Sequence, residues 1–166
     1  MKSQRDKRIL IFCSELHAPS GGNKVIVNLA NLLAENGHEI FLCIFDITKN
    51  SFFPIHTAVQ IIQEPLFFGI TPKGNTFSRK ISLLRDIRKI KKISSDLNPA
   101  IIITTEYHIA ISTVLAGVSS QAKIISWEHA QFYALEKSRF WKILFKLVYP
   151  RLDAVVCLNN NEKKLF

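Results

Sequence analysis

The sequence predicts an α/β fold built on a single doubly wound parallel sheet with helices on both faces. Three observations predict it: the apolar runs are short and continuous, amphipathic segments alternate with them, and each connection is long enough for a crossover. Strands of a parallel sheet are covered on both faces, so they appear as unbroken apolar runs. The 166 residues suffice for one domain with its own core.

Six runs are expected to form the strands, because each is apolar, short and bounded by polar or turn-forming residues. They are residues 9–13, 40–45, 59–62, 100–104, 123–127 and 154–158. No period of about 20 to 50 residues repeats along the chain, which argues against a solenoid. The alternation of strand and helix is that of a Rossmann-like sheet.

Apolar residues at spacings of three and four predict the helices. They are expected over residues 23–35, 78–97, 109–117 and 138–149. The first should end at Asn36-Gly37 and the second at Asn98-Pro99, two common stop signals. Residues 65–77 are predicted to form a loop. Asn159 and Glu162 have the spacing of a capping box, so a further helix is expected to begin there.

Composition and charge limit the partners and the location. Lys and Arg total 22 against 13 Asp and Glu, and the net charge of +9 predicts an anionic partner such as a phosphate, a nucleic acid or an acidic membrane surface. No stretch approaches the roughly 20 apolar residues of a membrane span, and the run after residues 1–8 is too short for a signal-peptide core. We therefore expect a cytoplasmic protein. Cys13, Cys43 and Cys157 lie in apolar runs without the spacing of metal ligands, and should be reduced core residues.

Gly21 and Gly22 follow the first predicted strand and precede the first predicted helix. Glycines in this position let backbone N–H groups at a helix N-terminus approach an anion, which predicts a phosphate-bearing ligand. The alternative is a turn that requires positive φ. Asp46, near the end of the second strand, suits a dinucleotide site, but the patterns G-x-G-x-x-G and G-x-x-x-x-G-K-S/T are both absent, which disfavours NAD and a Walker-type site.

Three pairs of Glu and His follow strands of the predicted sheet. They are Glu15 with His17, Glu106 with His108, and Glu128 with His129. Ligands of doubly wound sheets bind beyond the carboxyl ends of the strands, and carboxylates with imidazoles suit acid–base chemistry or the binding of sugar hydroxyls. The alternative is that these residues are polar because the edge is solvated.

Seven basic residues and one acid lie between residues 79 and 92, with most of the charge opposite the apolar stripe and with Ile81 and Leu84 among the cations. This mixture suits an anionic membrane surface, and the cations expected to face it are Arg85, Arg88, Lys89 and Lys92. A solvated basic face is the alternative. Nucleic acid is disfavoured because no aromatic residues are interleaved for stacking.

The helix predicted at residues 138–149 has only a narrow basic stripe and is otherwise apolar all round. Ordinary burial on several sides is the favoured interpretation. A lipid surface or a partner domain is the alternative.

Four segments in this order carry a resemblance to a known family. They are Gly21-Gly22 after the first strand, the helix and turn of residues 27–40, Trp127-Glu128-His129, and residues 153–158. The chain resembles the N-terminal, acceptor-side half of a retaining glycosyltransferase of the GT-B fold, family 4-like, in the group related to glycogen synthases and bacterial polysaccharide enzymes. The resemblance spans nearly all 166 residues, so residues 1–166 are expected to form one half of a GT-B fold.

The resemblance also implies roles for individual residues. Gly21 and Gly22 would approach the donor diphosphate, and His129 would be the catalytic residue that contacts the donor sugar near the reacting centre. Acceptor hydroxyls would be bound by Glu15, Glu106, His108 and Glu128. No metal or other cofactor is expected, since the nucleotide sugar serves as co-substrate.

The implied reaction moves a sugar from a nucleotide-sugar donor to a cell-surface polysaccharide or a lipid-linked acceptor, at the inner face of the membrane. In the family a second, C-terminal domain binds most of the donor. That domain is not among these residues, so the chain alone is expected to be inactive. The alternative function is a non-catalytic module that docks on an anionic membrane or nucleic acid. An encoding frame that continues past Phe166 would favour the enzyme.

Overall fold

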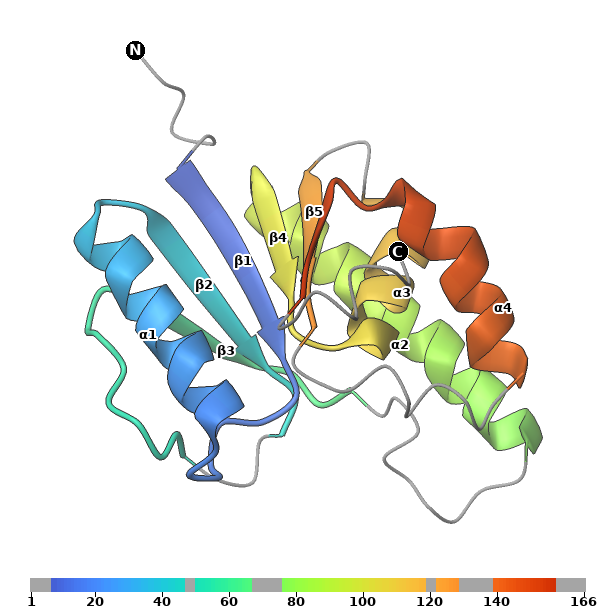
Figure 1. Cartoon of the computed structure of the whole chain (residues 1–166), viewed down its shortest axis with the longest axis horizontal. Coiled ribbons are helices and arrows are strands. Elements are labelled where there is room, and N and C mark those ends of the chain that lie inside the picture. Colours follow the sequence, from blue (N-terminus) through green and yellow to red (C-terminus); the bar gives the residue numbers. More distant parts are fainter. Residues whose placement is uncertain (1–6, 47–49, 67–75, 119–121, 129–138, 158–166) are drawn as a thin grey trace.

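The computed structural model describes residues 7–46, 50–66, 76–118, 122–128 and 139–157 (Figure 1). Its strands are β1 (Arg8–Cys13), β2 (Glu39–Ile44), β3 (Gln60–Gln63), β4 (Ile101–Thr104), β5 (Lys123–Trp127) and β6 (Ala154–Val156). Its helices are α1 (Gly21–Glu35), α2 (Thr76–Leu97), α3 (Tyr107–Leu115) and α4 (Arg139–Val148), the last followed by a 3-10 turn, Tyr149–Arg151. The predicted α/β class is confirmed.

The strands form one parallel sheet in the order β3-β2-β1-β4-β5-β6. The order therefore reverses between β1 and β4, which are hydrogen-bonded neighbours in the middle of the sheet. Side chains beyond the carboxyl ends of these two strands flank the position where doubly wound sheets bind their ligands.

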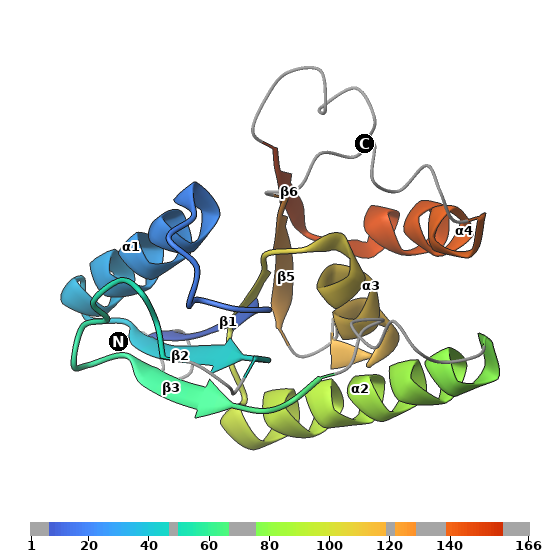
Figure 2. The same ribbon diagram turned by 90° about the horizontal axis from the view of Figure 1, so that it is seen from below.

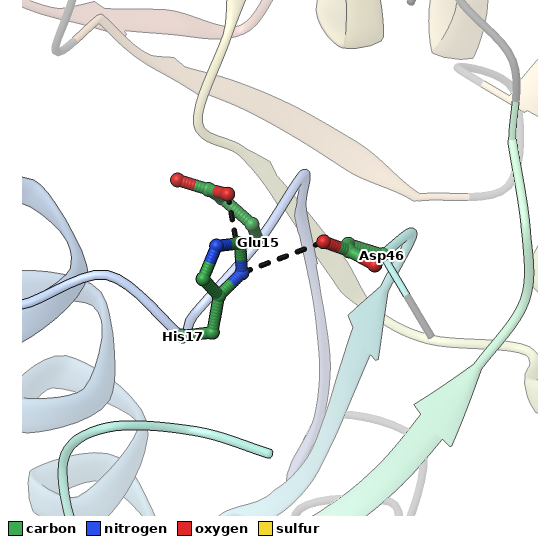
Figure 3. A group of neighbouring side chains, drawn as sticks. All are labelled: Glu15, His17 and Asp46. Carbon is green, nitrogen blue, oxygen red and sulfur yellow. Dashed lines mark ion pairs between the residues drawn. The ribbon is translucent and has the colours of Figure 1, made fainter. Parts of the chain in front are cut away.

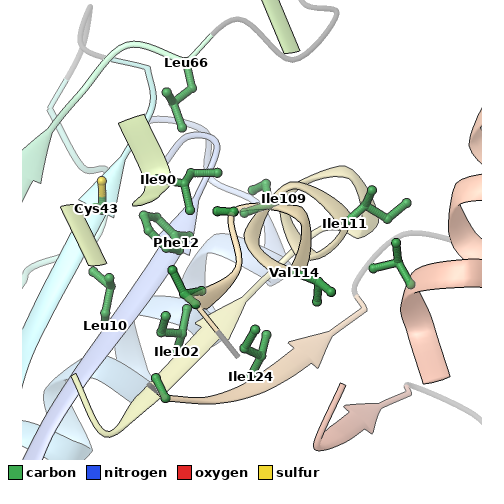
Figure 4. Packing of buried hydrophobic residues seen from close by; sticks show 14 of the residues in the cluster. Leu10, Phe12, Cys43, Leu66, Ile90, Ile102, Ile109, Ile111, Val114 and Ile124 are labelled. Carbon is green, nitrogen blue, oxygen red and sulfur yellow. The ribbon is translucent and has the colours of Figure 1, made fainter. Parts of the chain in front are cut away.

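The two faces of the sheet carry separate apolar clusters, because successive residues of a strand point to opposite sides. Leu10 and Phe12 of β1 pack with residues of α2, α3 and α4, among them Ile90 and Ile109 (Figure 4). The intervening residues of β1 pack under α1. Figure 2 shows the two layers, with α1 on one side of the sheet and α2 on the other. The predicted helices on both faces are thus confirmed.

The first helix begins two residues earlier than predicted, at Gly21. Ser20 is its N-cap, and the Ser20 hydroxyl accepts a hydrogen bond from the backbone N–H of Asn23 at 3.1 Å. A Ser cap satisfies a backbone donor that the helix leaves open, which offsets the poor helix propensity of two glycines. The predicted stop is confirmed, with Gly37 at a φ of +79° just after α1.

Other helices also begin at residues different from those predicted. The predicted loop of residues 65–77 ends earlier because α2 already begins at Thr76, and residues 67–75 lie outside the described residues. The third helix starts at Tyr107 rather than at residue 109. β3 is a largely exposed edge strand, with the pattern of burial expected of a strand that has one neighbour. The capping box predicted at Asn159 and Glu162 lies outside the described residues.

The cysteines of the central strands are free and buried, as predicted for Cys13 and Cys43, whereas Cys157 is partly exposed. The Cys13 thiol donates to the carbonyl oxygen of Cys43, with Sγ 3.7 Å from the oxygen. Burial raises the pKa of both thiols, that of Cys43 to about 12, so they remain protonated. Among the helices that the structure describes, none combines the length and apolar character needed to cross a membrane.

Candidate functional site at the carboxyl edge of the sheet

The structure brings two of the predicted Glu–His pairs to the reversal point of the sheet. Glu15 and His17 follow β1, and Glu106 and His108 follow β4, its hydrogen-bonded neighbour. Asp46, just beyond β2, joins the first pair. Carboxylates and imidazoles therefore gather beyond three adjacent strands, where a ligand of this fold would bind.

The ring of His17 lies between two carboxylates (Figure 3). Its Nδ1 is 3.2 Å from Oε2 of Glu15 and 3.4 Å from Oδ2 of Asp46. The side chains are 25% exposed for His17, 44% for Glu15 and 30% for Asp46, so the group is open to solvent on one side. Sequence reasoning considered Asp46 only for a dinucleotide site. Its place beside His17 follows from the pairing of β1 with β2.

Backbone hydrogen bonds fix the segments that carry these side chains. The N–H of Asp46 donates to the carbonyl oxygen of Ser14 at 2.7 Å, which continues the β1–β2 pairing beyond the strands. Leu16, between the two residues of the Glu–His pair, is buried, and its carbonyl oxygen accepts from Phe52 N–H at 2.8 Å. The extended β1–β2 pairing and the buried Leu16 thus fix the backbone that carries Glu15, His17 and Asp46.

The second pair stands at the start of α3. Glu106 occupies the N-cap position, and its Oε2 lies 3.1 Å from Nε2 of His108. Only 14% of the His108 side chain is exposed. Burial lowers the pKa of His108, and the neighbouring Glu106 carboxylate opposes part of that shift.

Acidification should destabilise the domain partly through His108. Because burial lowers its pKa below the ordinary 6.5, the unfolded chain takes up this proton more readily than the folded one. The stability that neutral His108 contributes is present above about pH 6.5 and is lost as the pH falls towards its folded pKa. His108→Gln should therefore lose less stability between about pH 7 and pH 5 in urea titrations. A steeper loss in the variant would mean that the pairing with Glu106 outweighs burial.

Glu128 differs from the other predicted acceptor-binding residues because its carboxylate is turned into the protein. It is 6% exposed, and its Oε1 accepts hydrogen bonds from the hydroxyls of Ser126, at 2.5 Å, and Tyr149. The Tyr149 ring stacks on Phe145 of α4, and burial followed by the Glu128 charge raises the pKa of Tyr149. These contacts favour a structural role that joins β5 to α4. One sign of this role is visible in the sequence, namely a serine, Ser126, inside an apolar strand.

His129, predicted to be catalytic, lies outside the described residues. The residue before it, Glu128, continues the pairing of β5 with β6, because its N–H donates to the carbonyl oxygen of Val156 at 3.0 Å. The role of His129 therefore stays a prediction.

Gly21 and Gly22 form the first turn of α1, at the same edge of the sheet (Figure 1). Among the described glycines, positive φ occurs at Gly37 and Gly117, so the turn alternative is wrong for Gly21 and Gly22. A Cβ at position 21 would meet no atom within 4 Å. Neither backbone conformation nor crowding therefore requires glycine at position 21, and what glycine provides there is an uncovered backbone.

The donors of this first turn are the groups that an anion would use. A helix has no internal acceptor for its first four N–H groups. Here Ser20 N–H donates to the Ala18 carbonyl oxygen at 2.8 Å and Asn23 N–H to the Ser20 hydroxyl at 3.1 Å. The remaining two belong to Gly21 and Gly22. The chain thus offers two backbone donors and the positive end of the helix dipole at one point.

The cations predicted on α2 are not equivalent. Arg85, Arg88 and Lys92 are exposed, and Leu84 beside them is 56% exposed. Lys89 instead forms an ion pair with Glu64, with Nζ 2.6 Å from Oε1, and donates to the carbonyl oxygen of Pro65. Lys89 therefore joins α2 to the segment that follows β3.

The helix predicted to be buried on several sides has an exposed face among residues 142–148, the part of α4 whose side chains the structure describes. Phe145 and Val148 of α4 are buried in the core, whereas Ile143 is 59% and Leu147 60% exposed. Lys146 lies exposed next to Leu147. The expectation of ordinary burial was wrong for the outer face of α4.

Several solved glycosyltransferases have a similar fold. Sucrose-phosphate synthase from Thermosynechococcus elongatus matches 95% of this chain with a TM-score of 0.69 at 12% identity, and the match covers 44% of that protein. The lipopolysaccharide outer core galactosyltransferase WaaB matches 95% with a TM-score of 0.65 at 12% identity, over 41% of its length. LpCGTa, solved in complex with UDP, matches 76% with a TM-score of 0.52 at 12% identity. The fold is one half of a GT-B glycosyltransferase.

The sequence identifies the family more narrowly. The family model described as Glycosyltransferase Family 4 matches residues 19–166, and the chain belongs to this family. An uncharacterized glycosyltransferase of Haemophilus influenzae is 25% identical over 168 aligned positions, which cover 96% of this chain and 43% of the relative. The chain thus spans less than half the length of the relatives it matches.

Proposed function

We propose that this chain is the acceptor-side domain of a glycosyltransferase that moves a sugar from a nucleotide-sugar donor to a glycan or lipid-linked acceptor of a cell-surface polysaccharide. Membership of glycosyltransferase family 4 supports the reaction class. The observation that carries the proposed positions of donor and acceptor is the uncovered first turn of α1. It lies at the same edge of the sheet as the two Glu–His pairs.

The donor diphosphate would approach Gly21 and Gly22. Their two N–H groups and the helix dipole favour a dianion, and the absence of side chains lets the phosphates reach the backbone. The solved UDP complex of LpCGTa, a protein of similar fold, supports a nucleoside diphosphate as the leaving group. Two donors are too few to hold a whole nucleotide, so a second domain would bind the rest.

The acceptor would lie over Glu15, Glu106 and His108. The Glu15 side chain is 44% and the Glu106 side chain 32% exposed, so both carboxylates can accept hydrogen bonds from sugar hydroxyls. Neutral His108 can donate or accept such a bond. Glu128 contributes to this surface only through the structure it supports. His129 follows Glu128 and would contact the donor sugar, and no metal is assigned to the transfer step.

Transfer assays test the proposal. The chain alone, supplied with a panel of nucleotide sugars and lipid-linked acceptors, should give no transfer. The same residues expressed with whatever their reading frame encodes beyond Phe166 should release nucleoside diphosphate in the presence of acceptor. Transfer by the chain alone would contradict the need for a second domain. A frame that ends at Phe166 would favour a docking module without chemistry.

We also propose that the exposed cations of α2 attach the domain to the inner, anionic face of a membrane, where lipid-linked acceptors are held. Arg85, Arg88 and Lys92 are exposed on the same helix as the exposed Leu84, a combination suited to lipid headgroups with a shallow apolar contact. Each basic residue near such a surface contributes about 1 kcal/mol. Three such charges can therefore add considerably to the free energy of binding that a weak contact with the acceptor provides.

Co-sedimentation with liposomes that contain anionic lipid measures this attachment. Changing Arg85, Arg88 and Lys92 to Glu should weaken binding at least about tenfold. The matched control changes three exposed cations elsewhere, Lys24, Lys123 and Arg151, to Glu, and so alters net charge equally. Equal loss in both variants would indicate attraction by overall charge, and no loss in either would remove the membrane proposal.

A further inference from the structure

We propose that Glu15, His17 and Asp46 form a binding site for a divalent transition-metal cation of the zinc type. The site goes beyond the proposed sugar transfer, although Glu15 also belongs to the proposed acceptor surface. One imidazole and two carboxylates provide three ligand atoms within 4.8 Å of one another, drawn from the ends of two paired strands (Figure 3).

The separations of the ligand atoms suit such a cation. Nδ1 of His17 lies 3.2 Å from the Glu15 carboxylate and 3.4 Å from the Asp46 carboxylate. Zinc binds nitrogen and oxygen at about 2.0–2.2 Å, which places tetrahedral ligands about 3.3–3.5 Å apart. Two of the three separations therefore match those of a bound cation, and the third, between the two carboxylates, lies within 4.8 Å and can shorten by side-chain rotation.

The chemistry of the set favours a transition metal over magnesium or calcium. Magnesium and calcium prefer oxygen ligands alone, whereas an imidazole nitrogen suits zinc and its neighbours. With neutral His17 the two carboxylates carry a charge of about −2, which a divalent cation balances. Three protein ligands leave a coordination position open for water or for an anionic group of a bound molecule.

The position of the group allows a cation to reach it and keeps the ligands in place. The side chains are between 25% and 44% exposed, so the site is open to solvent. The hydrogen bond from Asp46 N–H to the Ser14 carbonyl oxygen fixes the two segments relative to each other. Such preformed ligands lose little conformational entropy on binding.

Binding of Zn²⁺ and Co²⁺ to the tag-free, reduced chain tests the site directly. Calorimetry should give one Zn²⁺ per chain, and Co²⁺ should produce visible absorption of a low-symmetry complex. His17→Ala and Asp46→Asn should each weaken binding at least about tenfold, because each removes a ligand. The same titration with Mg²⁺ should give much weaker binding.

The matched control is His56→Ala, which removes an exposed histidine that is not one of the three ligands and whose Nδ1 accepts from Ala58 N–H. It should bind Zn²⁺ as the unchanged chain does. Failure of the unchanged chain to bind Zn²⁺, or equal binding by the His17 variant, would overturn the proposal and leave His17 in ion pairs only. Sugar transfer is measured separately, by release of nucleoside diphosphate, so loss of the metal site would leave the proposed function standing.

Discussion

Replacing Glu128 by alanine is expected to lower the free energy of unfolding by about 2–4 kcal/mol, because two buried hydroxyls lose their shared acceptor. Those hydroxyls belong to Ser126 of β5 and Tyr149 after α4, so the change loosens a link between distant parts of the chain. Urea titration of the purified variant measures the effect.

Two further variants separate a structural role from acceptor binding. Glu15→Ala, at a carboxylate of the same edge whose side chain is 44% exposed, should cost less than about 1 kcal/mol. Glu128→Gln keeps an oxygen acceptor and should retain most of the stability. If Glu128→Ala unfolds at the same urea concentration as the unchanged chain, the buried network does not support the fold. Glu128 would then return to the candidates for acceptor binding.

The second large effect is expected at Gly21, where a change should raise stability while weakening donor binding. Gly21→Asp places a carboxylate in the first turn of α1, which the helix dipole favours by about 0.3–1 kcal/mol. A Cβ there meets no atom within 4 Å, so we expect the fold to tolerate a side chain at this position. The same charge faces the donor diphosphate, and kcat/KM of the two-domain enzyme should fall at least about 100-fold.

Gly21→Asn is the matched control, since it has the shape of Asp without the charge. It should lose much less kcat/KM than Gly21→Asp and should leave the melting temperature nearly unchanged. Equal losses in the two variants would point to steric blocking of the backbone. Unchanged kcat/KM in both would show that no phosphate approaches this turn, and the assignment of the donor side would have to be abandoned.

The periodicity of the sequence predicted the fold well because both kinds of element rest on apolar patterns within a few residues. The continuous run of β1 and the three-to-four spacing of α2 each follow from burial of one face or two. The start of α1 was misplaced because glycine has poor helix propensity, whereas the Ser20 cap decides where the helix begins.

The candidate site was harder to predict because its contacts join strands that are distant in sequence. His17 meets Asp46 only because β2 pairs with β1. Glu128 was predicted to face a ligand at the carboxyl edge of the sheet, because it follows an apolar strand. Its partner Tyr149 is 21 positions away, and no local pattern links the two. Side-chain partners of this kind depend on tertiary packing, which periodicity does not encode.

The two outer strands of the sheet bear on how the domain behaves at high concentration. An outer strand presents unpaired backbone groups to which another chain can add. Here β3 has four residues, two of them glutamines, and β6 has three. Outer strands this short give another chain few bonds to form, and the net charge of +9 adds repulsion between copies. The domain should therefore resist growth by strand addition and remain dispersed in solutions of low salt.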